Sequence, residues 1–217
     1  LHVPMIIRWP SNFPAPTGLS PGSSCDRVIS LIDVTATTLA MADVPRPEKM
    51  QGRNFLGPNA DAPRRYAFSA RDRIDETVQR IRSVRDERWH YIRNFTAGPT
   101  FGSLNRYKEK CFLIMPLMRA LMAEGRLEGP PAALMGMRGP SEELYDTDAD
   151  PHEIRDLAGS PDARHREVLL RMRAALDQWI AETGDRGQWP DPPGVVTVFE
   201  REMHEWFGTP AWAGAGH

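Results

Sequence analysis

The hydrophobic pattern of this chain changes from helical to alternating near residue 60, and this change constrains the fold more than any other feature. Residues 30–41 repeat apolar side chains at helical spacing. Residues 51–63, which contain two glycines and two prolines, have the composition of a linker. The segments beyond it alternate apolar and polar side chains, which is typical of strands. The sequence therefore predicts two parts, with a boundary near residue 60.

The first part contains two apolar segments that should be buried against other parts of a protein. Val3–Trp9 is apolar on both faces, which favours an interior strand. The helix over 30–41 should bury the face that carries Leu31, Val34, Thr38 and Met41. A strand of this kind would expose both faces if it were alone. We therefore expect the chain to be a piece of a longer protein, packed on an N-terminal portion that precedes Leu1.

The second part predicts a four-stranded antiparallel sheet and a long helix. The expected strands are 66–70, 80–85, 89–94 and 143–146. A helix should start at Ser160-Pro-Asp162 and continue until Gly184, because its apolar side chains recur at helical spacing and should pack on the sheet; they are Leu169, Met172, Leu176, Trp179 and Ile180.

Three further segments complete the second part. Residues 107–124 predict a helix that Pro116 kinks or shortens. Residues 125–140 predict a loop, and residues 186–217, rich in proline, tryptophan and glycine, predict an extended tail. With 17 glycines and 20 prolines among 217 residues, a plain helical bundle is excluded.

Charge and hydropathy exclude two classes of partner. The chain has 27 Lys+Arg and 29 Asp+Glu, a net charge of −2, so the basic surface of a nucleic-acid-binding protein is missing. No apolar run approaches the roughly 18 residues that a membrane span needs. We therefore expect neither nucleic acid nor membrane as a partner.

The best candidate for a metal motif is Asp146-x-Asp148-x-Asp150, which copies the start of an EF-hand loop. The sixth loop position holds Pro151 instead of glycine, and the twelfth holds Leu157 instead of glutamate. We therefore expect a capped turn with solvated acids and no metal site. Histidine pairs, phosphate loops and nucleophile elbows with the usual spacings are absent as well.

The two cysteines, Cys25 and Cys111, lack the spacing of a zinc site or a disulfide framework. We expect each to be a buried packing residue.

A dense cluster of charges, Arg71-Asp-Arg-Ile-Asp-Glu76, follows the first expected strand of the sheet, and loops after strands often hold binding residues. Arg71 and Arg73 could grip an anionic group through paired N–H donors. Asp72, Asp75 and Glu76 could orient them or accept sugar hydroxyls. A solvated, internally paired run of charges is the alternative.

Four stretches in order resemble the C-terminal third of type I sulfatases, the formylglycine-dependent members of the alkaline phosphatase superfamily. They are His2–Pro10 ("R/H-V-P-x-I-x-x-W-P"), Ser30–Leu39 ("S-x-x-D-x-x-P-T-x-L", with Ala36 in place of Pro), Gln51–Leu56 ("x-G-x-S-L/F-L") and Glu143–Ala158 ("E-L-Y-D-L-x-x-D-P-x-E-x-x-N-L-A").

The resemblance implies an α/β, alkaline phosphatase-like fold in three segments. Residues 1–60 would be the last strand and helix of the catalytic α/β domain, and residues 61–185 a C-terminal α+β subdomain with the sheet and the long helix. Residues 186–217 would be the tail.

The resemblance also implies hydrolysis of sulfate esters or sulfamates, with a sulfated small molecule or glycan as substrate. Arg71, Asp72, Arg73 and His2 would contact that substrate. Formylglycine and Ca²⁺ would serve the parent protein, but the family's C-x-P-S/A-x-R motif has no counterpart here, and Cys25 is followed by Asp-Arg-Val. We therefore assign no catalytic residue and no metal ligand, and we expect this chain alone to be inactive.

Two other functions stay open. A phosphonate or phosphodiester hydrolase of the same superfamily would share the closing signature. A non-catalytic module could instead bind anionic glycan through Arg71, Arg73 and Arg82. The compartment would be periplasmic, extracellular or lysosomal if the parent carries a signal peptide.

Overall fold

The computed structural model describes residues 3–11, 20–96, 101–136, 138–192, 194–210 and 213. The chain divides into two compact units, Leu1–Ala67 and Phe68–His217. His2, a predicted substrate contact, lies outside the described residues. None of the helices in the described part is long and apolar enough to cross a membrane.

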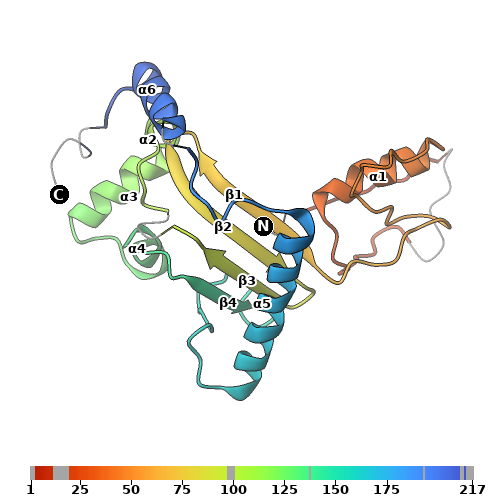
Figure 1. Cartoon of the computed structure of the whole chain (residues 1–217). Helices are drawn as coiled ribbons and strands as arrows, with labels where there is room; N and C mark the ends of the chain where they lie inside the picture. The colour runs from red at the N-terminus through yellow and green to blue at the C-terminus, as the bar shows by residue number, and fades with distance from the viewer. Residues whose placement is uncertain are drawn as a thin grey trace. The chain divides into compact units, whose positions relative to one another are not determined.

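The helix α1 of the first unit, Leu31–Met41, forms where the sequence predicts it (Figure 1). Ser30 and Asp33 make a capping box at its start. The side chains that α1 buries within this unit are Asp33, Ala36 and Thr37, whereas Leu31 on the predicted apolar face is 67% exposed. That face was expected to pack on a portion that precedes Leu1, and this stays a prediction. The face that α1 buries is polar because it lies against extended backbone, whose N–H groups need acceptors.

The predicted strand over Val3–Trp9 is also wrong. The segment has no regular structure, and Ile6 is 93% exposed. A strand needs a neighbouring backbone to complete its hydrogen bonds. None of the described residues makes a backbone hydrogen bond to this segment.

The predicted four-stranded sheet is confirmed in the second unit. Its strands, in the order β1-β2-β3-β4, are β1 (Ala67–Ile74), β2 (Thr77–Arg85), β3 (Trp89–Asn94) and β4 (Glu142–Asp146). β3 pairs antiparallel with both neighbours, so that Tyr91 lies opposite Val84 on one side and Leu144 on the other. All three side chains are fully buried, and they form the centre of the core.

The long helix α5, Ala163–Thr183, covers one face of this sheet (Figure 1), as predicted. The side chain of Asp162 accepts a hydrogen bond from the Arg164 N–H at 2.7 Å, which caps the first turn. Gly184 ends the helix with a φ of 60°, a conformation that favours glycine. The side chains that α5 buries are Leu169, Met172 and Leu176.

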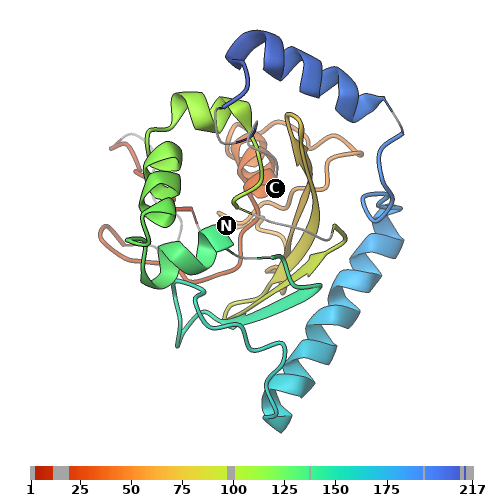
Figure 2. The same cartoon turned by 90° about the vertical axis from the view of Figure 1, so that its left-hand side faces the viewer.

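Three short helices lie on the other side of the sheet (Figure 2): α2 (Arg106–Cys111), α3 (Ile114–Ala123) and α4 (Gly129–Gly136). The predicted helix over 107–124 is thus broken into α2 and α3, and Pro116 sits in the first turn of α3, where proline is tolerated. The prediction of a loop over residues 125–140 is wrong, because this segment contains α4. Methionines from α3 and α4 form a small core, namely Met115, Met118 and Met135.

Two further predictions need correction. Cys25 and Cys111 are both exposed rather than buried. Residues 195–207 form a helix, α6 (Val195–Phe207), where an extended tail was expected. Its Met203 is buried and its Phe207 contacts Tyr107 of α2. These contacts explain why it folds, because packing of the apolar face stabilises an amphipathic helix.

Candidate functional site

The predicted cluster Arg71–Glu76 lies mostly within strand β1 and not in a loop after it. β1 continues through Ile74, and Asp75 and Glu76 form the turn to β2. The residues Arg71 to Ile74 alternate between partly buried and exposed, as a strand requires. A charged strand is suited to this position because β1 is an edge strand of the sheet.

Asp72 is bound to a buried arginine of the neighbouring strand. Arg82 is 1% exposed, and its guanidinium contacts the Asp72 carboxylate at 2.7 Å. It also donates to both oxygens of Asp185, at 2.7 and 2.9 Å, and to the carbonyl of Arg71 at 2.9 Å. The hydrogen bond from Arg82 lowers the pKa of Asp185. Arg82 therefore links β1, β2 and the end of α5. Its guanidinium is occupied by Asp72, Asp185 and the Arg71 carbonyl, so it is not available to bind a glycan.

Arg73 is held by the C-terminal segment. Its Nη1 contacts the Asp191 carboxylate at 3.1 Å, and its guanidinium carbon lies 4.3 Å from the centre of the Phe199 ring in α6. An arginine over an aromatic face gains from the cation–π interaction. Arg73 thus fixes α6 to the end of β1 (Figure 1).

Arg71 differs from both of its charged neighbours. Its Nε and Nη2 atoms are buried, and no described residue accepts a hydrogen bond from them. Burial lowers the pKa of the Arg71 guanidinium. Of the predicted site residues that the structure describes, Arg71 is the one that forms no ion pair with a described acidic side chain.

Two residues near Arg71 were missed from the sequence. Asn105 is 1% exposed and donates to the carbonyl of Ile74 at 3.2 Å, while its Oδ1 accepts from the Lys108 N–H at 2.9 Å. It therefore places the first turn of α2 on the β1–β2 turn, while the Lys108 ammonium lies 5.6 Å from the centre of the Phe101 ring. An asparagine before a helix predicts an N-cap, but nothing in the sequence links it to a strand some thirty residues earlier.

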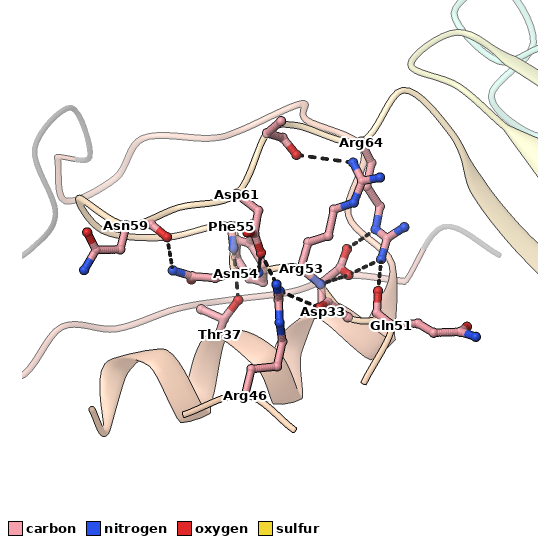
Figure 3. A network of polar contacts seen from close by, with 12 residues as sticks. Asp33, Thr37, Arg46, Gln51, Arg53, Asn54, Phe55, Asn59, Asp61 and Arg64 are labelled. Atoms are coloured by element: carbon pink, nitrogen blue, oxygen red, sulfur yellow. Dashed lines mark hydrogen bonds and ion pairs between the residues drawn. The ribbon is translucent and has the colours of Figure 1, made fainter. Parts of the chain in front are cut away.

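The motifs that carry the sulfatase resemblance have structural roles in the first unit (Figure 3). The Asp33 carboxylate receives two hydrogen bonds from Arg64, both at 2.6 Å, and one from the Arg53 N–H at 2.8 Å. Burial alone would raise the pKa of Asp33, but these hydrogen bonds outweigh it, and the pKa is lowered. The Thr37 hydroxyl accepts from the Phe55 N–H at 3.1 Å.

A second acid completes this network. Asp61 contacts Arg46 at 2.6 Å and accepts from the Asn54 N–H at 2.7 Å. Asn54 in turn donates to the carbonyl of Asn59 at 3.0 Å. Residues 51–64 are therefore fixed on α1 by hydrogen bonds to charged groups, and this segment is part of the first unit's packed structure.

The closing signature supports the edge strand β4. The Asp156 carboxylate accepts hydrogen bonds from the Leu144 N–H at 3.0 Å and the Ala158 N–H at 2.8 Å. The Leu157 N–H donates to the carbonyl of Leu144 at 2.8 Å. These bonds satisfy backbone groups of β4 that no fifth strand covers.

The acidic triplet at 146, 148 and 150 forms the predicted capped turn, but Asp146 is buried and paired with Arg88, and so it is not one of the solvated acids expected. Asp146 accepts from Nε and Nη2 of Arg88, at 2.9 and 2.6 Å. Asp150 accepts from the N–H groups of Ile154 and Arg155, both at 2.7 Å. In the described ranges no three His, Cys, Asp or Glu side chains are grouped to hold a metal ion. The residues present therefore do not fit the Ca²⁺ site of a sulfatase.

Comparison with curated proteins defines the class. An ulvan-active sulfatase from Formosa agariphila is 35% identical over 191 residues, which are 88% of this chain and 30% of that protein. A second ulvan-active sulfatase of the same organism is 27% identical over 85% of this chain and 34% of its own length. The chain spans about a third of the length of these relatives, and its similarity to them supports a C-terminal part of a sulfatase.

The match can be placed more closely within that class. Residues 1–108 match the family "N-sulphoglucosamine sulphohydrolase, C-terminal". Human N-sulphoglucosamine sulphohydrolase is 26% identical over 76% of this chain and 34% of its own length. Among solved structures, a 2-O GAG sulfatase aligns with 74% of this chain and 27% of its own, at 20% identity and a TM-score of 0.45.

Proposed function

We propose that this chain is the C-terminal portion of an enzyme that hydrolyses sulfate esters or sulfamates of an anionic carbohydrate. The 35% identity to an ulvan-active sulfatase, over 88% of the chain, carries the proposal. The name of the human relative, N-sulphoglucosamine sulphohydrolase, supports a sulfated sugar as the substrate. Since the related proteins are named as sulfatases, we favour sulfur chemistry over phosphonate or phosphodiester hydrolysis.

We further propose that residues 1–60 complete the catalytic domain and that residues 61–185 form the smaller subdomain, followed by the tail 186–217. In the longer protein, formylglycine and Ca²⁺ would supply the nucleophile and bind the sulfate oxygens. This chain would supply positive charge beside the substrate, because fixed donors stabilise an anionic group best where water is excluded. By itself the chain would be inactive.

The substrate contacts proposed are Arg71, Asp72, Arg73 and His2. Among the described residues of this set, Arg71 is the one whose buried Nε and Nη2 atoms have no hydrogen-bond partner. Asp72 and Arg73, held by Arg82 and Asp191, would shape the site around Arg71.

The longer protein should also cover the apolar surface of the first unit. Val3, Ile6, Leu31 and Ile32 are 53, 93, 67 and 49% exposed. Exposed apolar groups gathered in one part of a protein mark an interaction site. We propose that the catalytic portion packs on these side chains.

The test is an assay of the longer protein, with Ca²⁺, on N-sulphoglucosamine and on sulfated oligosaccharides. Release of sulfate is expected, together with no release by the 217-residue chain alone. The variant Arg71→Gln should raise KM, whereas Arg126→Gln, which removes the same charge from an exposed position paired with Glu124, should not. Turnover of phosphonate or phosphodiester substrates without sulfate release would contradict the proposal.

A further inference from the structure

Aromatic side chains of α2 and α6 form a continuous row on the surface of the second unit. The ring of Tyr107 in α2 contacts Phe112 on one side and Phe207 of α6 on the other, with ring centres 5.5 and 5.7 Å apart. Trp206 continues the row, 6.3 Å from Phe207. The row therefore runs from the end of α2 to the end of α6, two helices that lie against each other (Figure 1).

Aliphatic side chains at the start of α3 widen this row into a patch. Leu113 follows Phe112 directly, and it shares one side of the helix with Ile114 and Leu117, because residues three and four apart are neighbours on a helix. The opposite side of α3 holds the buried Met115 and Met118. We call this surface the α2–α6 patch. Its exposed side chains, which are between 42 and 86% exposed, are Tyr107, Phe112, Leu113, Ile114, Leu117 and Trp206.

The α2–α6 patch is large enough to be an interface. It exposes on the order of 600 Å² of apolar surface, taking about 200 Å² for a whole aromatic side chain and somewhat less for an aliphatic one. Each partner of a stable protein–protein interface contributes roughly 800 Å² in total, including a polar rim. Contiguous apolar surface of this size marks an interaction site.

The charges around the patch are complementary to each other. α2 contains three basic residues and one acidic residue, a net charge of +2, whereas α6 contains one basic and three acidic residues, a net charge of −2 with its histidine neutral. Lys110 is next but one to Phe112 at one end of the aromatic row, and Glu205 is next to Trp206 at the other. Both are exposed, and neither forms an ion pair with a side chain in the described ranges.

We propose that the α2–α6 patch binds a second copy of this chain about a two-fold axis. The two aromatic rows are antiparallel, and Lys110 of each copy pairs with Glu205 of the other. A two-fold interface uses the same patch twice and must be complementary to itself, as a surface with one basic end, an apolar centre and one acidic end is. A partner of another sequence would have to supply matching charges of its own, whereas a second copy already has them.

This interface does not depend on the sulfatase function. It also differs from the apolar surface of the first unit, which the catalytic portion would cover. The experiment therefore uses the 217-residue chain with Ile6→Gln and Leu31→Gln, so that these two exposed side chains do not contribute to association. Sedimentation equilibrium should show a monomer–dimer equilibrium.

Leu113→Gln and Trp206→Gln should each raise the Kd of the dimer at least about tenfold, because a few large side chains carry most of the binding energy of an interface. Leu170→Gln removes an apolar side chain from a 61% exposed position of α5 and should leave the Kd unchanged. Thermal unfolding checks that each variant folds. A chain that stays monomeric at roughly 100 μM, or a Kd that neither patch variant raises, would overturn the proposal.

A charge exchange tests the antiparallel arrangement. Lys110→Glu and Glu205→Lys should each weaken the dimer at least about fivefold, because each places like charges opposite one another at both ends of the interface. The two changes together should restore the Kd to within about twofold, since the opposite charges meet again. Arg166→Glu makes the same charge change on α5 and should have no effect. A double variant as weak as the single ones would overturn the arrangement.

The longer protein decides between a second copy and the rest of the polypeptide as the partner. A dimer that Lys110→Glu weakens and the double variant restores would support the proposal, whether or not the protein hydrolyses sulfate esters. A monomeric longer protein, with a 217-residue chain that dimerises through the patch, would show that the catalytic portion covers it. That result would overturn the proposal and leave the sulfatase function intact.

Discussion

At the scale of single residues, most described side chains of the motifs that resemble sulfatases hold the fold together and have no free group for a ligand. Asp33 and Asp156 belong to recognisable motifs, and both are occupied by backbone N–H groups or arginines of the same unit. Arg71 belongs to no motif. Its buried Nε and Nη2 atoms have no described hydrogen-bond partner. This cannot be read from a sequence, since sequence spacing does not show which of several nearby acids pairs with which arginine.

Replacing Asp33 by Asn should lower the free energy of unfolding of the first unit by about 3 kcal/mol, since it leaves the Arg64 guanidinium without its buried partner. Amide hydrogen exchange of α1 measures the effect. Asp43→Asn is the matched control, because Asp43 is exposed and has a φ of 55°, which asparagine tolerates. Equal losses in both variants would contradict a special role for Asp33.

The same carboxylate should make the first unit sensitive to acid. The pKa of Asp33 is lowered in the folded state, so its contribution is present above the unfolded pKa of about 3.9 and is lost as the pH falls through the folded pKa. Exchange protection of α1 should therefore fall below about pH 4. In Asp33→Asn, protection should be lower at neutral pH and should fall less steeply in acid. An identical acid profile would exclude Asp33 as the titrating group.

Arg71→Gln should raise the pKa of Lys108. Burial lowers this pKa first and the charge of Arg71 lowers it further, so removing that charge takes away one of the two causes. An NMR titration of the lysine side chains measures the shift, and Arg126→Gln should leave the Lys108 pKa as it is. A Lys108 pKa that does not respond to Arg71→Gln would show that the two charges do not interact.

At the scale of elements, the sequence predicts those helices and strands that have a regular hydrophobic pattern and recognisable capping residues. The four strands and α5 show a regular period and clear end signals, Asp162 and Gly184 among them, and they form as predicted. The helices α4 and α6 were not predicted, because glycine and proline at their ends concealed them. The sequence did not indicate that Asp33, Ala36 and Thr37 of α1 are buried within the first unit, because the neighbour of this face is polar backbone.

Gly187 lies so close to the side chains of Arg82 and Asp72 that one added methyl group should disturb their packing. A Cβ at Gly187 would lie 1.4 Å from Nη2 of Arg82 and 2.6 Å from Oδ1 of Asp72. Gly187→Ala should therefore destabilise the second unit by about 1 to 3 kcal/mol, measured by urea unfolding. Gly159→Ala, where a Cβ meets nothing within 4 Å, should change stability by less than about 0.5 kcal/mol. Equal stability of the two variants would show that Arg82 can move aside without cost.

At the scale of the whole molecule, the two units differ in how well they cover their own apolar side chains. The second unit has a core built from β2, β3, β4 and α5, in which Val84, Leu144, Met172 and Leu176 are all fully buried. The fully buried side chains of the first unit include the acid Asp33, and Leu56 is buried as well, while Ile6, Leu31 and Ile32 are exposed. The first unit therefore owes its order to hydrogen bonds and ion pairs more than to apolar burial, which suits a segment that packs on something else.

This difference predicts that the 217-residue chain binds a hydrophobic dye through its first unit. Ile6→Gln with Leu31→Gln should lower dye binding and self-association without lowering the midpoint of thermal unfolding, because both side chains are exposed, at 93 and 67%. Leu170→Gln, at a 61% exposed position of α5, is the matched control and should change dye binding much less, since it removes an apolar group from the other unit. If the double variant instead unfolds at lower temperature while dye binding stays the same, the two side chains stabilise the chain itself and are not a surface that another part of a longer protein covers.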